Sequence, residues 1–281
     1  MATRIFNDRR WIFLLMGLLV VALYTLGEAH ELPNEEPVQA YFDTIEALPK
    51  GSIVLLSTDF DPGSTAELGP MFDATIHHLF KRDLRVISTC TWPAAPPIPR
   101  ASFGKIAPQY GKVYGQDWVE LGFLVGDDVA MGLIGQSLRS AYPNDSRNHA
   151  PYQTFPLLRD VSDSSRGVAL LITISAGFPG ILEWIPQLVT RYNVPVLAGS
   201  TAVQTPSMYP YYPKPLKGFL GAATGATEYL QILAREVPAV DPMRIEGQRR
   251  MLVQSWAHVL IVLLIVAGNV IYFRSRGKAT A

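Results

Sequence analysis

The two longest apolar segments of the chain lie near its two ends. Residues 11–26 contain no charged side chain, and residues 256–273 contain few strongly polar ones. Each segment comes close to the roughly 20 residues that an α-helix needs to cross a bilayer. The pattern therefore predicts two transmembrane helices, over residues 11–27 and 255–273.

Basic residues flank both segments on the sides that face the chain ends. They are Arg4, Arg9 and Arg10 before the first segment, and Arg274, Arg276 and Lys278 after the second. Because short segments rich in Lys and Arg stay in the cytoplasm, residues 1–10 and 274–281 are expected to be cytoplasmic tails. Residues 28–254 would then lie on the extracytoplasmic side of the cytoplasmic (inner) membrane, whose lipid is an expected partner.

A cleaved signal peptide is the alternative interpretation of the first segment. Its basic start and the small residues Gly27 and Ala29 suit a secretory cleavage site. The apolar stretch is longer than the roughly 7–15 apolar residues of a signal peptide. We therefore expect a helix that is retained.

Between the two segments, short apolar runs alternate with stretches that have helical periodicity. Strands are expected at residues 52–57, 84–88, 118–124, 167–175 and 194–198, and helices at residues 35–48, 64–81 and 216–236 and before residues 140 and 192. The second helix would open with the capping box Ser64-Thr65-Ala66-Glu67. Strands that alternate with helices predict a mainly parallel sheet covered on both faces, hence one three-layer, Rossmann-like α/β domain. Residues 91–117 are rich in Pro and Gly and receive no assignment.

Composition narrows the class of protein further. The 24 Lys and Arg residues balance the 24 Asp and Glu residues, which excludes the basic surface of a nucleic-acid binder. Charged residues make up 17% of the chain, below the roughly 25% of soluble domains, so part of the chain is expected in lipid. A single cysteine excludes an internal disulfide framework and a multi-Cys metal site.

Ligands of open parallel sheets bind beyond the carboxyl ends of the strands. The expected strands place there Thr58, Asp59, Asp61, Thr89, Cys90, Thr91, Asp127, Asp128, Ser175, Gly177, Gly199, Ser200 and Thr201. The ligand-binding candidates among them are Thr58, Asp59, Asp61, Asp127, Ser175, Gly177, Ser200 and Thr201.

The acidic residues of this set have two interpretations. Asp59 and Asp61 could hold a divalent cation together with Asp127 or Asp128, since hard cations prefer carboxylate oxygens. Alternatively, Asp61 and Asp128 cap helices, because each acidic pair precedes a helix. We favour capping, expect no cofactor, and keep Asp59 and Asp61 as the only metal-ligand candidates.

Three other motifs have structural explanations that we prefer to catalytic ones. Cys90 could be a nucleophile, but a buried structural cysteine is the simpler interpretation. The pair His77-His78 points in two directions on a helix, which argues against a shared metal ion. Gly218, Gly221 and Gly225 lack the spacing of a nucleotide loop and favour close helix packing. No catalytic residue is assigned.

Two features point to contacts with other proteins. The segment 208–213 is rich in Tyr and Pro, and Tyr209, Tyr211 and Tyr212 are candidates for an interaction loop, because tyrosine is enriched at interfaces. The alternative is a loop that packs on its own sheet. Asn269, inside the second apolar segment, favours association with another helix.

Several short motifs resemble one known family. They are Lys50-Gly-Ser-Ile-Val54, Asp59-Phe-Asp-Pro62, Ala176-Gly-Phe-Pro-Gly180, Glu183-Trp-Ile185, Arg191-Tyr-Asn-Val-Pro195, Ala198-Gly-Ser-Thr-Ala202 and Tyr209-Pro-Tyr-Tyr212. Over residues 35–235 the chain is similar to a family of uncharacterised bacterial and archaeal membrane proteins, with an α/β domain between two terminal transmembrane helices. Residues 218–228 depart from the family pattern. The resemblance implies no activity and no catalytic residues.

The leading hypothesis is a membrane-anchored, extracytoplasmic accessory or scaffold subunit. It would act by contact with other membrane proteins or with further copies of itself. One alternative is a hydrolase that depends on a divalent metal and uses Asp59, Asp61 and Asp127. Another is a small-molecule sensor of the periplasmic-binding type, with residues 175–212 in its pocket.

Overall fold

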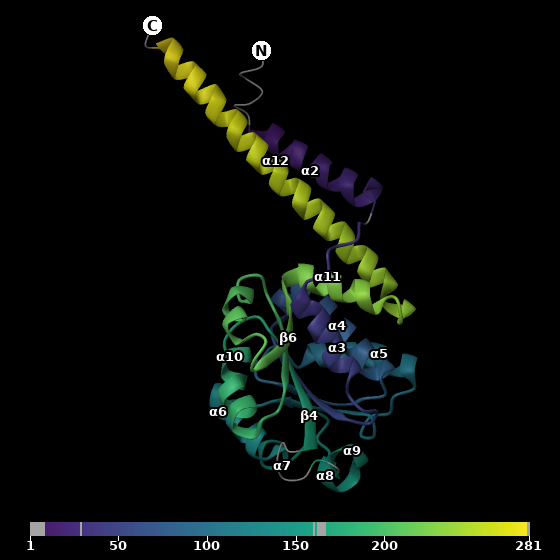
Figure 1. Cartoon of the computed structure of the whole chain (residues 1–281). Helices are drawn as coiled ribbons and strands as arrows, with labels where there is room; N and C mark the ends of the chain where they lie inside the picture. The colour runs from purple at the N-terminus through teal and green to yellow at the C-terminus, as the bar shows by residue number, and fades with distance from the viewer. Residues whose placement is uncertain (1–8, 29, 160, 162–166, 280–281) are drawn as a thin grey trace. The chain divides into compact units, whose positions relative to one another are not determined.

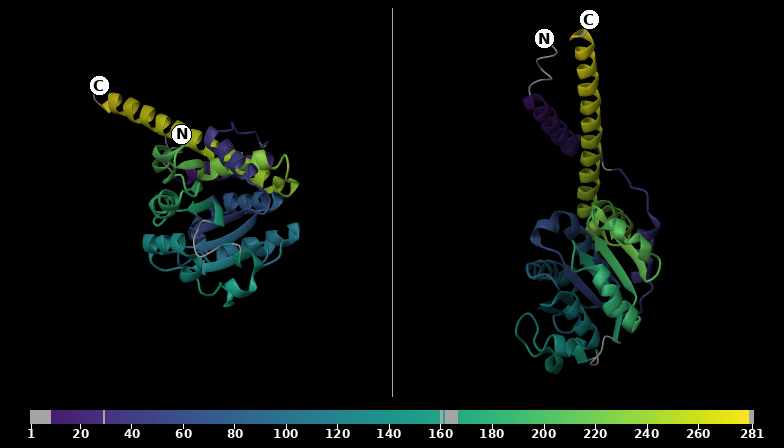
Figure 2. Two further views of the ribbon diagram at one scale, coloured as in Figure 1. Left: turned by 60° about the horizontal axis from the view of Figure 1, so that its bottom comes forward. Right: turned by 90° about the vertical axis from the view of Figure 1, so that its left-hand side faces the viewer.

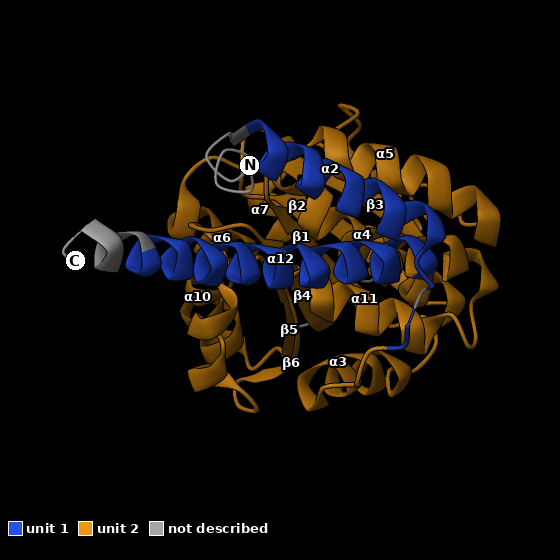
Figure 3. Ribbon diagram, turned by 90° about the horizontal axis from the view of Figure 1, so that it is seen from above, with its two compact units in different colours: residues 1–31, 245–281 blue, residues 32–244 orange. Residues whose placement is uncertain are grey.

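The computed structural model describes residues 9–28, 30–159, 161 and 167–279. The chain divides into two units, residues 1–31 with 245–281 and residues 32–244 (Figure 3). Arg4 and Ala29 lie outside the described residues, and so do the side chains of Arg9, Arg276 and Lys278.

The larger unit is built on one six-stranded parallel sheet (Figure 1). Its strands are β1 (Ile53–Asp59), β2 (Arg85–Cys90), β3 (Trp118–Phe123), β4 (Val168–Ser175), β5 (Val196–Ser200) and β6 (Leu216–Gly221). The strand order β3-β2-β1-β4-β5-β6 is that of Rossmann folds, and it reverses between β1 and β4. The predicted α/β, Rossmann-like class is confirmed.

Helices cover both faces of this sheet. On one face lie α3 (Glu36–Glu46), α4 (Thr65–Lys81), α5 (Pro97–Ile106) and α11 (Ala222–Leu233), and on the other lie α6 (Asp127–Gln136), α10 (Ile181–Trp184) and its continuation η4 (Ile185–Thr190). The shorter helices are η1 (Pro62–Ser64), η2 (Ala107–Tyr110), α7 (Leu138–Ala141), α8 (Pro151–Thr154), α9 (Pro156–Arg159), η5 (Thr205–Ser207), η6 (Tyr209–Tyr211) and η7 (Pro238–Val240). The segment 91–117, unassigned from sequence, thus contains α5 and η2.

Burial on two faces explains why the strands are continuous apolar runs. All seven residues of β1 are buried. Val54 and Leu56 belong to the core beneath α4, whereas Leu55 belongs to the core beneath α10. A strand with two covered faces gains from apolar residues at every position, so the alternation typical of one-sided sheets is absent.

The helix predicted over residues 216–236 is wrong in its first part, because residues 216–221 form β6. The cause is Gly218, where a Cβ atom would overlap the backbone of Tyr41 in α3. Glycine therefore lets α3 lie directly on the edge strand. Gly221 and Gly225 are four residues apart, a spacing typical of one face of a helix. In the structure, however, Gly221 is the last residue of β6, and Gly225 is a buried residue of α11.

The capping box predicted at the start of α4 is also absent. The Ser64 hydroxyl instead donates to Oδ1 of Asp61, at 3.1 Å, and the side chain of Ser64 makes no cap. Glu67 accepts from the distant backbone N–H of Ala202, at 2.7 Å. The carboxylate of Glu67, which the capping box would use, is thus engaged in a tertiary contact instead.

The smaller unit contains α2 (Arg9–Leu26) and most of α12 (Asp241–Ala279), a single uninterrupted helix (Figure 2). By length and composition, one helix among the described residues could cross a membrane, over residues Pro238–Arg274. The apolar helix near the N-terminus is shorter. The Tyr24 hydroxyl donates to Oε2 of Glu246, at 2.7 Å, which joins α2 to α12.

Candidate functional site

Asp59 ends β1 where the strand order reverses, and its side chain is fully buried. Its Oδ1 accepts hydrogen bonds from the Ser57 hydroxyl at 2.7 Å and from the Thr91 hydroxyl and N–H at 2.6 and 3.1 Å. Its Oδ2 accepts from the Thr173 hydroxyl at 2.8 Å and from the Trp184 indole N–H at 3.1 Å. Asp59 therefore connects the ends of β1, β2 and β4 to the covering helix α10.

The donor set suits a carboxylate that is structural. Burial raises the pKa of Asp59 above its ordinary value, and the side-chain hydrogen bonds, led by that of Thr91, lower it in part. The Thr91 backbone N–H and the indole N–H can only donate. Five hydrogen bonds occupy the roughly four lone-pair directions of a carboxylate. Asp59 thus has no acceptor site left to offer a ligand.

The other acidic candidates do not join Asp59. Oδ1 of Asp61 accepts from the backbone N–H of Ser64, at 3.0 Å, and caps η1. Asp127 and Asp128 are exposed in the first turn of α6. Within the part of the chain that the structure describes, no cluster of three or more His, Cys, Asp or Glu side chains is suited to a metal ion.

The remaining polar candidates bond to their own loops. The Ser175 hydroxyl donates to the carbonyl of Gly177, at 2.9 Å, and accepts from its N–H, at 3.2 Å. The hydroxyls of Ser200 and Thr205 lie 3.1 Å apart, and Thr205 also donates to the carbonyl of Thr201, at 2.9 Å. These contacts shape the turns after β4 and β5.

Cys90 has the surroundings of a structural cysteine. It is fully buried, and burial raises the pKa of its thiol, which the negative charges of Asp59 and Glu120 raise further. Thr58, the remaining ligand candidate, is likewise buried and interacts with this thiol. A nucleophilic cysteine needs the opposite setting, a lowered pKa beside a cation.

The two adjacent histidines are also held in the core. A ring nitrogen of His77 lies 2.9 Å from the Tyr110 hydroxyl. His78 bridges the Tyr229 hydroxyl, at 2.7 Å, and Oε1 of Glu46, at 2.8 Å. Burial lowers the pKa of both histidines to about 4, so both rings are neutral at pH 7.

Glu120 is a buried acid that sequence reasoning missed. It lies in the edge strand β3 with a fully buried side chain, and among the described residues neither carboxylate oxygen has a hydrogen-bond partner. The nearest cation is Arg100, whose Nη2 lies 3.6 Å from Oε1. Burial raises the pKa of Glu120, and Arg100 lowers it in part. The sequence signal that could have revealed it is a single acidic residue within the otherwise apolar strand β3.

Large apolar side chains are exposed at the carboxyl edge of the sheet. Phe123 (37% exposed) is the last residue of β3, Val125 (78%) and Val129 (74%) follow β3, Phe178 (65%) follows β4, and Val203 (90%) follows β5. We call these five residues the edge patch. Residues 123–138, 175–190 and 200–213 contain no Lys or Arg, whereas Asp127 and Asp128 are exposed. The segments that contain the edge patch are therefore apolar and acidic, with no basic side chain of their own.

The segment 208–213, which contains the three candidate tyrosines, lies in the connection between β5 and β6, on the face of the sheet that α10 covers. Met208 is fully buried, and Tyr211 and Tyr212 pack against the core beneath α10. Tyr209 is half-exposed, with its ring edge-on to that of Phe219 at 5.1 Å. Two of the three tyrosines thus serve packing, and Tyr209 keeps an accessible face.

Comparisons with protein-family models, with curated proteins and with solved structures found no match to this chain. The resemblance drawn from the short motifs stays a prediction.

Proposed function

We propose that this protein is a membrane-anchored accessory or scaffold subunit. Its α/β domain would lie outside the cytoplasm and bind another membrane protein through the edge patch. The observation that carries this proposal is the contrast between the polar and the apolar side chains at the carboxyl edge of the sheet. Asp59 is buried and bonded to the ends of the neighbouring strands, Ser175 and Ser200 are buried and bonded to their own loops, and large apolar side chains are exposed.

The anchor is proposed from the two terminal helices. Pro238–Arg274 is long enough to span a bilayer, and α2, with 18 residues, would extend about 27 Å at roughly 1.5 Å per residue. That length approaches the roughly 30 Å of a hydrocarbon core. The basic residues that flank the two apolar segments on the sides of the chain ends support cytoplasmic tails.

The chemistry of the edge patch supports a protein partner rather than a polar substrate. Exposed apolar patches mark contacts with proteins or membranes. The exposed Asp127 and Asp128 would be repelled by anionic lipid headgroups, which argues against direct contact with the bilayer. We therefore expect a partner surface that is apolar at its centre and basic at its rim.

Site-specific photo-crosslinking in cells tests the edge patch directly. A photoreactive amino acid would be placed at Val125, Phe178 or Val203, one position at a time. The matched control is Val113, an apolar residue that is 54% exposed but precedes β3 at the opposite edge. We expect an adduct of one defined mass from the three edge positions and none from Val113.

Native mass measurement in mild detergent provides the second readout. A complex with other membrane proteins, lost on Val125→Asp or Phe178→Asp and kept on Val113→Asp, would support the proposal. A monomer without adducts at any edge position would refute it. A pure homo-oligomer joined through the edge patch would identify the partner as a second copy of this chain.

The orientation has a separate test. Cys90 is buried, so a membrane-impermeant maleimide should not label the native protein. The variant Val203→Cys presents a thiol at the most exposed position of the edge patch. Labelling of this variant in intact spheroplasts is expected, whereas labelling only after lysis would place the domain in the cytoplasm.

A further inference from the structure

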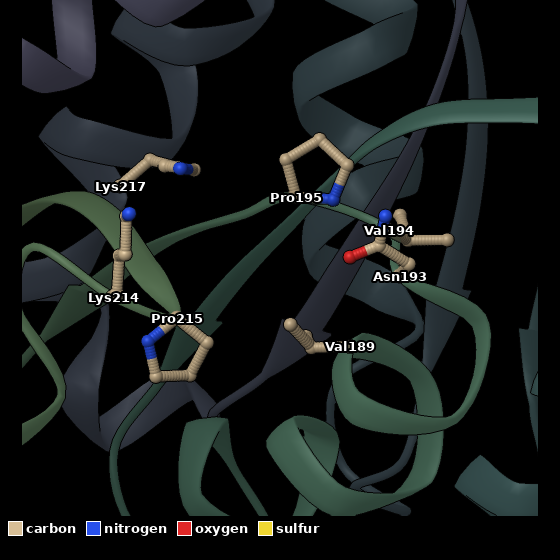
Figure 4. A pocket seen from close by; sticks show the side chains of 7 residues that line it. All are labelled: Val189, Asn193, Val194, Pro195, Lys214, Pro215 and Lys217. Atoms are coloured by element: carbon tan, nitrogen blue, oxygen red, sulfur yellow. The ribbon is translucent and has the colours of Figure 1, made fainter.

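A groove of about 650 Å³ lies at the amino ends of β5 and β6, at the other end of the strands from the edge patch (Figure 4). Its apolar walls are Val189, Val194, Pro195 and Pro215, and its polar residues are Asn193, Lys214 and Lys217. This volume lies within the roughly 300–1,000 Å³ of small-molecule sites. The groove is thus large enough for a ligand with both an apolar and a polar part.

Two lysines of the groove have no ion-pair partner in the described part of the chain. Lys214 and Lys217 lie together on one side of it, and the Asn193 carboxamide lies on the other (Figure 4). Both lysines are exposed, and neither forms an ion pair among the described residues. Elsewhere in the domain, Lys50, Lys81 and Lys112 each lie within about 3 Å of a carboxylate oxygen.

We propose that this groove binds an organic phosphate monoester. Two ammonium groups that line the same groove match a head group of nearly two negative charges, and lysine is a common phosphate ligand. The Asn193 amide can donate a further hydrogen bond. Val189, Val194 and the two prolines would cover the apolar part of the ligand. The groove is separate from the edge patch, so this inference does not rest on the proposed protein contact.

Two sources of such a group are distinguishable, a soluble phosphate monoester and the head group of a phosphatidate lipid. Calorimetric titration of the full chain in an uncharged detergent would compare phenyl phosphate, inorganic phosphate and soluble dihexanoyl phosphatidate. Both esters should bind about tenfold or more tightly than inorganic phosphate, because only they fill the apolar walls. Tighter binding of the phosphatidate would indicate a lipid, and tighter binding of phenyl phosphate a soluble ligand.

The variants decide whether the groove is responsible. Lys214→Ala with Lys217→Ala should weaken phenyl phosphate binding at least about tenfold, and Lys214→Arg with Lys217→Arg should retain it. The matched control, Lys50→Ala with Lys105→Ala, removes the same charge from exposed positions outside the groove. Equal weakening in the control, or unchanged binding without Lys214 and Lys217, would overturn the proposal. Absence of binding to the intact chain would overturn it as well.

Discussion

Two buried carboxylates on the same sheet have opposite surroundings. Asp59 and Glu120 are both fully buried. Asp59 lies in the central strand β1 and accepts five hydrogen bonds. Glu120 lies in the edge strand β3, and among the described residues no group donates to it. The difference lies in what the neighbouring elements supply.

Strand position explains the contrast. β1 has a hydrogen-bonded strand on each side, so Thr173 from β4 and Thr91 from the end of β2 both reach Asp59, and Trp184 closes the site from above. β3 has one neighbour, and Arg100 approaches Glu120 only to 3.6 Å, beyond hydrogen-bond distance. Burial raises the pKa of both acids, but Asp59 is held by hydrogen bonds from several elements, whereas Glu120, among the described residues, has only the partly exposed ion pair with Arg100.

The largest expected effect is that of Asp59→Ala. The substitution leaves the Thr91 N–H and the Trp184 indole N–H buried without acceptors, which should lower the free energy of unfolding by about 3–5 kcal/mol. Denaturant unfolding of the full chain in detergent would measure it. Asp61→Ala, which removes only a cap, should cost about 1 kcal/mol. Equal losses for the two variants would contradict the comparison.

Trp184→Phe tests a single donor of the Asp59 network. The change removes the indole N–H and some core volume, and we expect a loss of about 2–3 kcal/mol. Trp92→Phe is the matched control, because its indole donates to the neutral carbonyl of Pro179, at 2.9 Å, and should cost about 1 kcal/mol. If Trp92→Phe lowered the free energy of unfolding more than Trp184→Phe, the hydrogen bond from Trp184 to Asp59 would not be the stronger of the two.

Glu120→Gln should have the opposite sign and depend on pH. The raised pKa of Glu120 means that the native state binds its proton more tightly than the unfolded state. The contribution of Glu120 to stability therefore falls as pH rises from its ordinary value through the raised one. The variant should gain about 1 kcal/mol at pH 8 and nothing near pH 4.5, in thermal unfolding compared with wild type. A gain independent of pH would contradict this explanation.

Arg100→Met should have the smallest effect. Its side chain is 58% exposed, so solvent screens the ion pair, and a loss of about 0.5 kcal/mol at pH 8 is expected. A double-mutant cycle with Glu120→Gln checks the cause, because the effect of Arg100→Met should vanish when Glu120 is uncharged. An undiminished effect would mean that Arg100 acts through packing.

The α/β class and most strands and helices could be predicted from the sequence, because the patterns that indicate them are local. The apolar runs of β1 and β4 and the helical period of α3 and α4 depend only on near neighbours in the chain. Where Gly218 allowed α3 to approach, the same local rules assigned helix to β6. No pattern within residues 216–221 records the position of Tyr41, which the fold brings against them.

The site residues show the same limit. The sequence alone placed Asp59 at the carboxyl edge and gave the apolar ends, the neutral net charge and the alternation of strands with helices. Only the tertiary structure decided that Asp59 turns inward, that Glu120 is buried with no donor among the described residues, and that Lys214 and Lys217 share a groove. The physical reason is distance along the chain: Thr173 and Trp184, which hold Asp59, lie 114 and 125 residues away from it. Residue types and their spacing fix local structure, whereas hydrogen-bond partners and exposure depend on segments that meet only when the chain folds.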